Sequence, residues 1–130
     1  MTLHTDPGNE VEPTVKHGLD VNRYEQFIEF ASRNPDTVRG ELAVIGEYEG
    51  TAYHSSFHLG RYEMGGEEAG TQRDYTLHIG VPREFEEAIG HVDPVDRMES
   101  LEVALGALTT CIDSTIAQAA LLEGHDIDHI

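Results

Sequence analysis

The only thiol in the 130-residue sequence belongs to Cys111. A cysteine reacts as its thiolate, and a free thiol with a pKa of about 8.5 needs nearby positive charge or hydrogen-bond donors to ionise at neutral pH. Cys111 lies in the middle of a predicted helix, far from its N-terminus, so a cation must come from elsewhere: Arg39, Arg61 and Arg73 are the candidates. The alternative is that Cys111 is a small buried hydrophobic residue.

Two carboxylates lie near this thiol in the sequence, and one of them is a candidate for a catalytic role. Glu102 precedes Cys111 by nine residues, about two and a half helical turns, which places the two on nearly opposite sides of the helix. Glu102 is therefore either a catalytic candidate or a solvated carboxylate in the first helical turn. Asp113 lies in an otherwise apolar segment and needs a partner if it is buried.

Three histidines lie on predicted strands, where a zinc or nickel site can be imagined. His54 and His58 share one strand face, and His78 on a later strand faces the same side. Residues four apart on a strand are about 13 Å apart, too far to bind one ion. We therefore expect solvated histidines on a polar sheet face, with no metal ligands and no cofactor.

The element that must position Cys111 is a long helix from Leu101 to Gly124. Apolar residues recur there at three- and four-residue steps, which places them on one helical face: Leu101, Leu105, Leu108, Ile112, Ile116, Ala119 and Leu122. Small residues fill much of the remaining surface, so the helix is typical of a protein interior. Asp93 with Pro94 and Ser100 are alternative starts, and Gly124 is the predicted stop. At roughly 35 to 45 Å, this helix must be covered by the rest of the chain or by a second copy.

The charge balance excludes several classes of partner. The sequence has 25 acidic and 8 basic residues, a net charge of -17, and Lys16 is the only lysine. Nucleic acid and anionic membranes are not expected partners, because both attract basic surfaces. The acidic, lysine-poor composition resembles that of proteins from salt-loving organisms. Without a signal peptide or a run of eighteen apolar residues, the sequence predicts a cytoplasmic protein.

The remainder of the chain predicts an antiparallel β-meander. Residues 1–18 are expected to be a flexible tail, and residues 19–130 one domain. Helical patterns cover 22–34 and 83–89, strand patterns cover 37–45, 51–59 and 73–81, turns or loops cover 46–50 and 60–70, and 125–130 begins a further strand. The predicted fold class is α+β, an antiparallel meander packed on the long central apolar helix.

One stretch also carries a resemblance to a known family. Residues 100–111 read SLEVALGALTTC, and the helix that follows is Ala-rich and ends in EGHDID. This resembles the OsmC and Ohr family of osmotically induced and organic-hydroperoxide-resistance proteins, in which Pro-x-Glu is followed by a Leu/Ala run, two small residues and Cys. The similarity covers roughly residues 37–130. The C-terminal part of the family fold is short or missing after Ile130.

The resemblance implies an intertwined homodimer with a reactive cysteine at the subunit interface, where it reduces organic hydroperoxides. The family's peroxidases use a second cysteine to resolve the sulfenic acid, and this chain has none. The peroxidase branch of the family has an arginine at its first hairpin, but the predicted turn 46–50 contains none. Leu101 stands where that branch has a glutamate.

Two hypotheses therefore stay open. In the first, Cys111 is a peroxiredoxin-like thiol that an external thiol recycles, and Leu108, Ile112 and Phe57 line the substrate cleft. In the second, the protein is a non-catalytic binding or assembly module of the same fold, and Cys111 is a packing residue.

Overall fold

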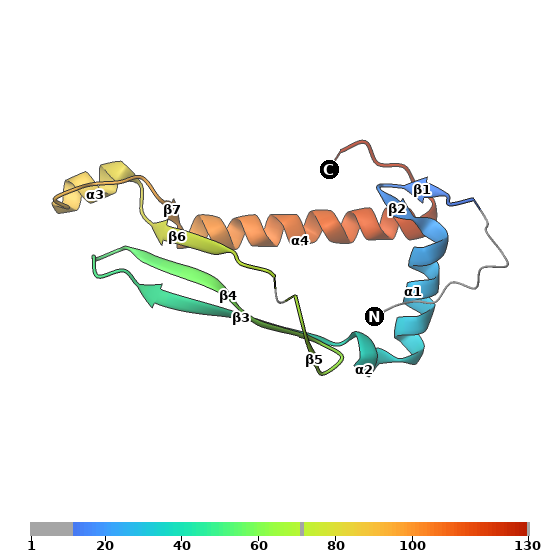
Figure 1. Ribbon diagram of the computed structural model, residues 1–130. Helices are drawn as coiled ribbons and strands as arrows, with labels where there is room; N and C mark the ends of the chain where they lie inside the picture. Colours follow the sequence, from blue (N-terminus) through green and yellow to red (C-terminus); the bar gives the residue numbers. More distant parts are fainter. Residues whose placement is uncertain (1–11, 71, 130) are drawn as a thin grey trace.

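The computed structural model describes residues 12–70 and 72–129 as an α+β fold (Figure 1). The elements are β1 Val15–Lys16, β2 Leu19–Asp20, α1 Val21–Arg33, α2 Pro35–Val38, β3 Gly40–Tyr48, β4 Ser55–Met64, β5 Glu67–Ala69, β6 Thr76–Gly80, α3 Arg83–Ile89, β7 Met98–Glu99 and α4 Ser100–Glu123. The predicted class is confirmed, since an antiparallel meander is combined with a long apolar C-terminal helix.

The main sheet has the strand order β3-β4-β6-β7, with β5 paired to β4. The pairs among β3, β4, β5 and β6 are antiparallel, whereas β6 and β7 are parallel. The predicted turn 46–50 is wrong, because Gly46 pairs with Phe57 inside the sheet and β3 continues to Tyr48. The chain reverses instead after Tyr48, where Gly50 and Tyr53 have positive φ. The predicted loop 60–70 is also wrong in part, because it contains the end of β4 and all of β5.

The N-terminal helix begins at Val21, because the Asp20 carboxylate accepts hydrogen bonds from the Asn22 and Arg23 amides. Asp20 is therefore the cap, and the helix starts one residue before the predicted range 22–34. Strands β1 and β2 form a small antiparallel ladder, and β1 lies within the segment predicted as a tail, whose residues 1–11 are outside the described part. The strand predicted from residue 37 begins at Gly40, after the short helix α2.

The long helix begins at Ser100, which settles the choice between the two predicted starts. Glu99 and Glu102 form a reciprocal capping box there, with the Glu99 amide donating to the Glu102 carboxylate at 2.8 Å. At the other end Gly124 adopts a left-handed conformation with φ 75° and ends the helix as predicted. The strand predicted after it is absent from residues 125–129.

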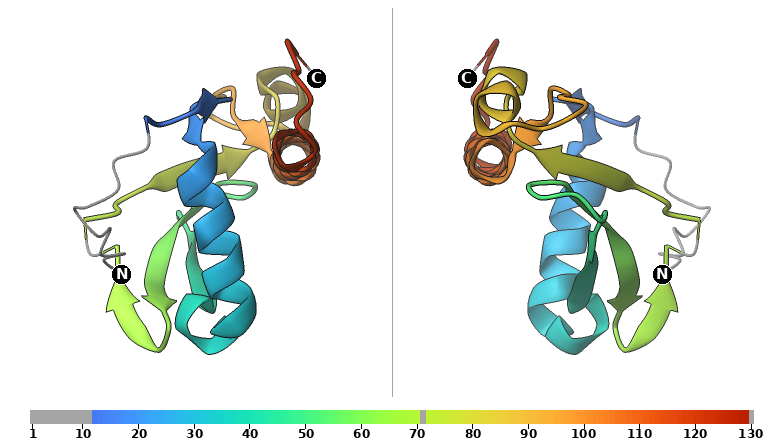
Figure 2. Two further views of the ribbon diagram at one scale, coloured as in Figure 1. Left: turned by 90° about the vertical axis from the view of Figure 1, so that its right-hand side faces the viewer. Right: turned by 90° about the vertical axis from the view of Figure 1, so that its left-hand side faces the viewer.

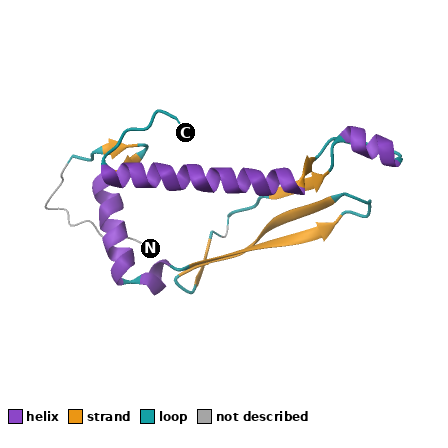
Figure 3. Ribbon diagram, turned by 180° about the vertical axis from the view of Figure 1, so that it is seen from behind, coloured by secondary structure: helices purple, strands orange, loops and turns teal. Residues whose placement is uncertain are grey.

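Within one chain α4 is largely uncovered. Its two buried residues, Ala120 and Leu121, lie near its C-terminal end, where contacts also join Lys16 to Asp126 and His17 to the His125 carbonyl. Figure 2 views the helix end-on, with the sheet and α1 lying to one side of it. The expectation that the meander covers one side of the helix is therefore not met within the single chain. The same arrangement is visible from behind in Figure 3.

Both the helix and the sheet expose large apolar side chains: Leu42, Val44, Ile45 and Tyr48 on β3, and Leu101, Leu105, Leu108, Ile112, Ile116 and Leu122 on α4. Among the residues described, α4 is the one helix long and apolar enough to cross a membrane by length and composition. A soluble monomer rarely exposes contiguous apolar patches larger than a few hundred Å². These apolar surfaces are uncovered in the single chain.

Leu121, 3% exposed near the end of α4, is one of the few fully packed apolar residues. Leu121→Ala should lower the free energy of unfolding by about 2 to 5 kcal/mol, because a buried cavity replaces the side chain. Urea unfolding at fixed protein concentration measures this change. Val92→Ala, at a position 92% exposed, is the control and should change stability by less than about 0.5 kcal/mol. Equal small effects of the two substitutions would contradict the assigned burial.

Candidate functional site

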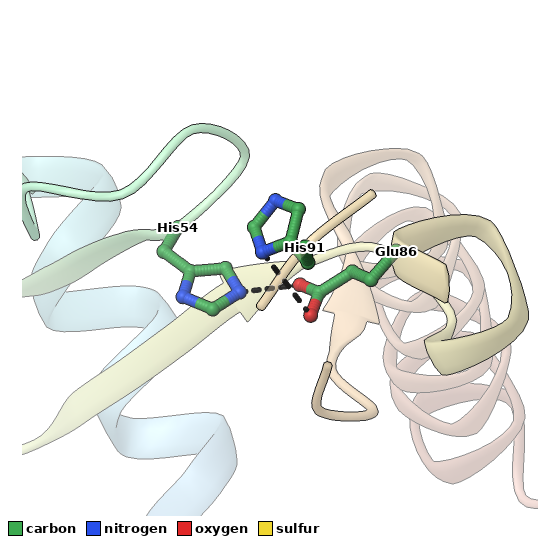
Figure 4. Close-up of side chains that lie close together, drawn as sticks. All are labelled: His54, Glu86 and His91. Carbon is green, nitrogen blue, oxygen red and sulfur yellow. Dashed lines mark hydrogen bonds and ion pairs between the residues drawn. The ribbon is translucent and has the colours of Figure 1, made fainter. Parts of the chain in front are cut away.

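Three polar side chains converge where the β3–β4 turn meets α3 (Figure 4). Glu86 on α3 is completely buried. His54 Nε2 contacts one carboxylate oxygen, Oε1, in a short hydrogen bond, and His91 Nδ1 lies 3.6 Å from the other, Oε2. The two imidazole rings are 5.1 Å apart between centroids. A buried carboxylate held between two imidazoles is the most chemically distinctive cluster among the described residues.

The end of α3 brings His91 against Glu86. Gly90 adopts φ 87°, a left-handed conformation that suits glycine, and reverses the chain. The His91 amide then donates to the Glu86 carbonyl at 2.9 Å, the long-range bond of a Schellman motif. Such motifs often pair apolar side chains at these two positions. Here the pair is a histidine and a glutamate.

The β3–β4 turn supplies the other imidazole. Tyr53 has φ 65°, which is uncommon for a bulky residue and has a conformational cost. Its ring packs edge-on against Phe85, with the centroids 5.7 Å apart. Consecutive residues of the turn, Tyr53 and His54, therefore contact consecutive residues of α3, Phe85 and Glu86. This double contact fixes the position of His54.

Glu86 is ionised in this surrounding. Burial by itself would raise the pKa of its carboxyl. The Val95 amide, which donates to Oε2 at 2.8 Å, and the imidazoles of His54 and His91 outweigh burial and hold the pKa below its usual value. The fully buried group is thus a carboxylate that lies beside the Val95 amide and the imidazoles of His54 and His91.

Residues 93–97 form the loop that fastens α3, which explains why the long helix does not start at Asp93. Asp96 accepts a hydrogen bond from the Arg83 amide at 3.2 Å and so caps the start of α3. The Arg97 amide donates to the Val81 carbonyl at 3.2 Å, and its guanidinium pairs with Glu49. With the Val95 amide bound to Glu86, the loop makes four contacts that a helical conformation would break.

The stability of the fold is expected to depend on pH through the carboxyl group of Glu49. The hydrogen bond from Arg97 holds the pKa of the Glu49 carboxyl below its usual value of 4.5, with a further contribution from His78. A carboxyl whose pKa is lowered by folding stabilises the fold above its unfolded pKa, and this contribution is lost as the pH falls through the folded pKa. Glu49→Gln should therefore be less stable than the wild type at neutral pH, and the difference should shrink below pH 4.5.

Urea unfolding across pH 3 to 7 at constant salt, roughly the window in which carboxyls titrate, measures this difference. Glu25→Gln on the exposed side of α1 is the matched control. A stability gap for Glu49→Gln that stays the same at every pH would refute the assigned role.

The residues predicted to serve Cys111 are not brought together in the chain. The Cys111 side chain is exposed midway along α4, and Glu102 is used in the capping box nine residues earlier, about 13 Å along the helix axis. Arg39 pairs with Glu41 at 3.6 Å. Arg61 pairs with Glu63 and Glu68, and Arg73 lies over the Tyr62 ring.

The prediction of solvated histidines is wrong for His54, which is nearly buried and contacts the Glu86 carboxylate. His54, His58 and His78 do not converge, and His78 Nδ1 instead lies 3.1 Å from Glu49. The cluster of His54, Glu86 and His91 was not predicted, because Glu86 stands in an acidic run that resembles a solvated helix face. Gly90 followed directly by His91 was the available signal, since a left-handed helix end returns the next residue toward Glu86.

No protein-family model and no curated protein matches the chain significantly. The site is therefore interpreted from its geometry. A groove beside the cluster is lined by Tyr53, Phe85 and Ser100 among others. Leu108, Ile112 and Phe57, the predicted substrate-lining residues, are not part of this groove.

Proposed function

We propose that the protein is a homodimeric, thiol-dependent reductase of organic hydroperoxides of the OsmC type, with Cys111 as the nucleophile. The observation that carries the proposal is the position of Cys111 on an uncovered apolar helix. Its neighbours Leu108 and Ile112 are 59% and 49% exposed. An apolar surface around a thiol favours hydroperoxides with a hydrocarbon group over hydrogen peroxide.

A second copy of the chain is the best candidate to cover these surfaces. The helix α4 and the strand β3 both expose apolar side chains, so the helix of one protomer can pack against the sheet of its partner and each copy supplies what the other lacks. A membrane would account for the helix and leave the sheet exposed. Asp113 in the middle of α4 and the net charge of -17 also disfavour a bilayer.

The reaction proceeds by attack of the Cys111 thiolate on the peroxide oxygen remote from the carbon. The S–O bond forms as the O–O bond breaks, and the leaving alkoxide takes a proton to become an alcohol. Cysteine is oxidised to sulfenic acid while the hydroperoxide is reduced. Because the sequence has one cysteine, an external thiol condenses with the sulfenic acid and releases water, and a second external thiol then regenerates Cys111 and leaves as a disulfide.

In the dimer a cation from the partner is expected to stabilise the thiolate. Arg39 directly precedes β3 and Arg61 lies on β4, the sheet that the partner's helix would cover. Arg39 pairs with Glu41, and Arg61 pairs with Glu63 and Glu68. A guanidinium has five N–H donors, so each arginine keeps donors for a further partner.

The second candidate function is a non-catalytic binding or assembly module with Cys111 as a packing residue. The engagement of Glu102 in the capping box and of Arg39 with Glu41 favours it, because neither is reserved for the thiol. The two functions differ in the reactivity of Cys111 toward an alkylating reagent at neutral pH. Catalysis requires rapid labelling of the native protein, whereas a packing role requires protection until unfolding.

The test of the proposal is consumption of an organic hydroperoxide in the presence of a small thiol, by the wild type and by Cys111→Ser. The proposal requires that the variant lose the activity. Equal rates would reject it.

A further inference from the structure

The cluster of His54, Glu86 and His91 has the composition of a metal site. It offers two imidazole nitrogens and a carboxylate oxygen, and these three atoms all lie within 4.8 Å of one another. Two imidazoles and one carboxylate are the protein ligands of open zinc sites and of non-haem iron sites. We propose that His54, Glu86 and His91 bind one divalent transition-metal ion per chain, of which zinc is the probe used below.

The distances require only a small adjustment. Zinc binds nitrogen and carboxylate oxygen at about 2.0 to 2.2 Å, so two ligand atoms of one tetrahedral ion lie roughly 3.3 Å apart. The three candidate atoms lie within 4.8 Å of one another, and an ion between them would replace the hydrogen bond between His54 and Glu86. Figure 4 shows both rings directed toward the Glu86 carboxylate from different segments of the chain.

The carboxylate is held in place as a ligand must be. Glu86 is fully buried, and the Val95 amide fixes its Oε2 atom at 2.8 Å. Hydrogen bonds of this kind to a ligating carboxylate are typical of the second coordination shell. The side chains of His54 and His91 are 11% and 10% exposed. An ion can therefore enter, and a water molecule can complete its coordination.

The two imidazoles differ in how they approach the Glu86 carboxylate. His54 makes a hydrogen bond to Glu86, but His91 Nδ1 lies 3.6 Å from Oε2, which is longer than a hydrogen bond. The His91 imidazole therefore faces the carboxylate without a hydrogen bond to it, and a cation between them would bind both groups. The ion would join two parts of the chain that are far apart in the sequence, the β3–β4 turn and the C-terminal end of α3.

The inference is independent of the proposed function, because Cys111 is not among the ligands and the cluster lies on other elements.

The test of the metal site is calorimetric titration of the full chain with zinc alone, after removal of metals by a chelator. The titration is run in 1 M KCl, where the Debye length of about 3 Å suppresses loose binding to the acidic surface. We expect one zinc ion per chain, and a rise in Tm with zinc, because an ion that binds only the folded state stabilises it.

Variants then identify the ligands. Removing a second-shell partner typically weakens metal binding by 10- to 100-fold, so His54→Ala and His91→Ala should each weaken it by at least about 100-fold. His125→Ala, at a histidine 70% exposed on its side chain, is the matched control and should bind zinc like the wild type. Cys111→Ser should also bind it unchanged.

Three results would overturn the proposal. The first is a wild-type protein that takes up no zinc and gains no Tm in 1 M KCl, which needs no variant. The second is full zinc uptake by a folded His54→Ala/His91→Ala double variant, with folding checked by circular dichroism. The third is a sulfur ligand in the X-ray absorption spectrum of the zinc-loaded wild type, which also decides the matter if the double variant does not fold.

Discussion

Ile112→Asp is expected to convert the dimer into monomers. Ile112 is 49% exposed on α4, and the proposed dimer buries it in both copies. Full burial of an exposed isoleucine contributes about 1.5 to 3 kcal/mol, so burial of the exposed half in two copies contributes about 1.5 to 3 kcal/mol in total. An unpaired charge in the interface adds a further cost to the loss of this contribution. Since each 1.4 kcal/mol is a tenfold change, the dissociation constant should rise by about 100-fold or more.

Sedimentation velocity across a range of protein concentrations measures this shift. The wild type should sediment at twice the chain mass of 14.4 kDa, and the variant at the chain mass or as unfolded protein. Gln26→Asp, which adds the same charge to an exposed position of α1, is the control and should remain dimeric. A wild type that is monomeric and folded at every concentration would contradict the account of the apolar surface.

Cys111→Ser is expected to abolish hydroperoxide reduction. A serine hydroxyl is a far weaker nucleophile than a thiolate and cannot pass through the sulfenic acid and the mixed disulfide. Removal of a catalytic nucleophile typically lowers rates by several orders of magnitude, so we expect a fall of at least roughly 1,000-fold. The oxidation of a small thiol by an organic hydroperoxide, followed by loss of the hydroperoxide, measures the rate.

Two comparisons make this result specific. The variant must sediment as the wild type does, so that the loss is not caused by dissociation. Ser114→Ala, a change of similar size on the same helix, should leave the rate within a few-fold of the wild type. If Cys111→Ser retains the wild-type rate while Ser114→Ala is also unaffected, the activity does not involve this thiol and the assembly function is preferred.

The elements with strong local signals were predicted well from the sequence. The end of α4 at Gly124 and the helix α3 follow from a glycine stop and from helical spacing. The three antiparallel strands follow from alternation of apolar and polar residues. Boundaries were less accurate where tertiary contacts decide them. The loop 93–97 has helical capping residues, yet it is held in a loop by its bonds to α3 and the β3–β4 turn.

The candidate metal cluster could not be predicted from local sequence patterns alone. His54 and Glu86 are 32 residues apart, and their contact depends on a turn whose position was predicted several residues too early. The sequence left open whether the rest of the chain or a second copy covers the apolar helix. In the single chain α4 and Cys111 are exposed, and this exposure is the physical basis for the proposed dimer.

The central claim is that Cys111 reacts with organic hydroperoxides. The most direct measurement treats the native protein, without any reducing thiol, with one equivalent of an organic hydroperoxide, and then determines the mass of the Cys111 peptide together with the alcohol formed. We expect each chain to gain one oxygen atom at Cys111 and to release one molecule of alcohol. The oxygen stays on Cys111 because the chain has no second cysteine with which the sulfenic acid can react. Unchanged Cys111 beside unreacted hydroperoxide would contradict it.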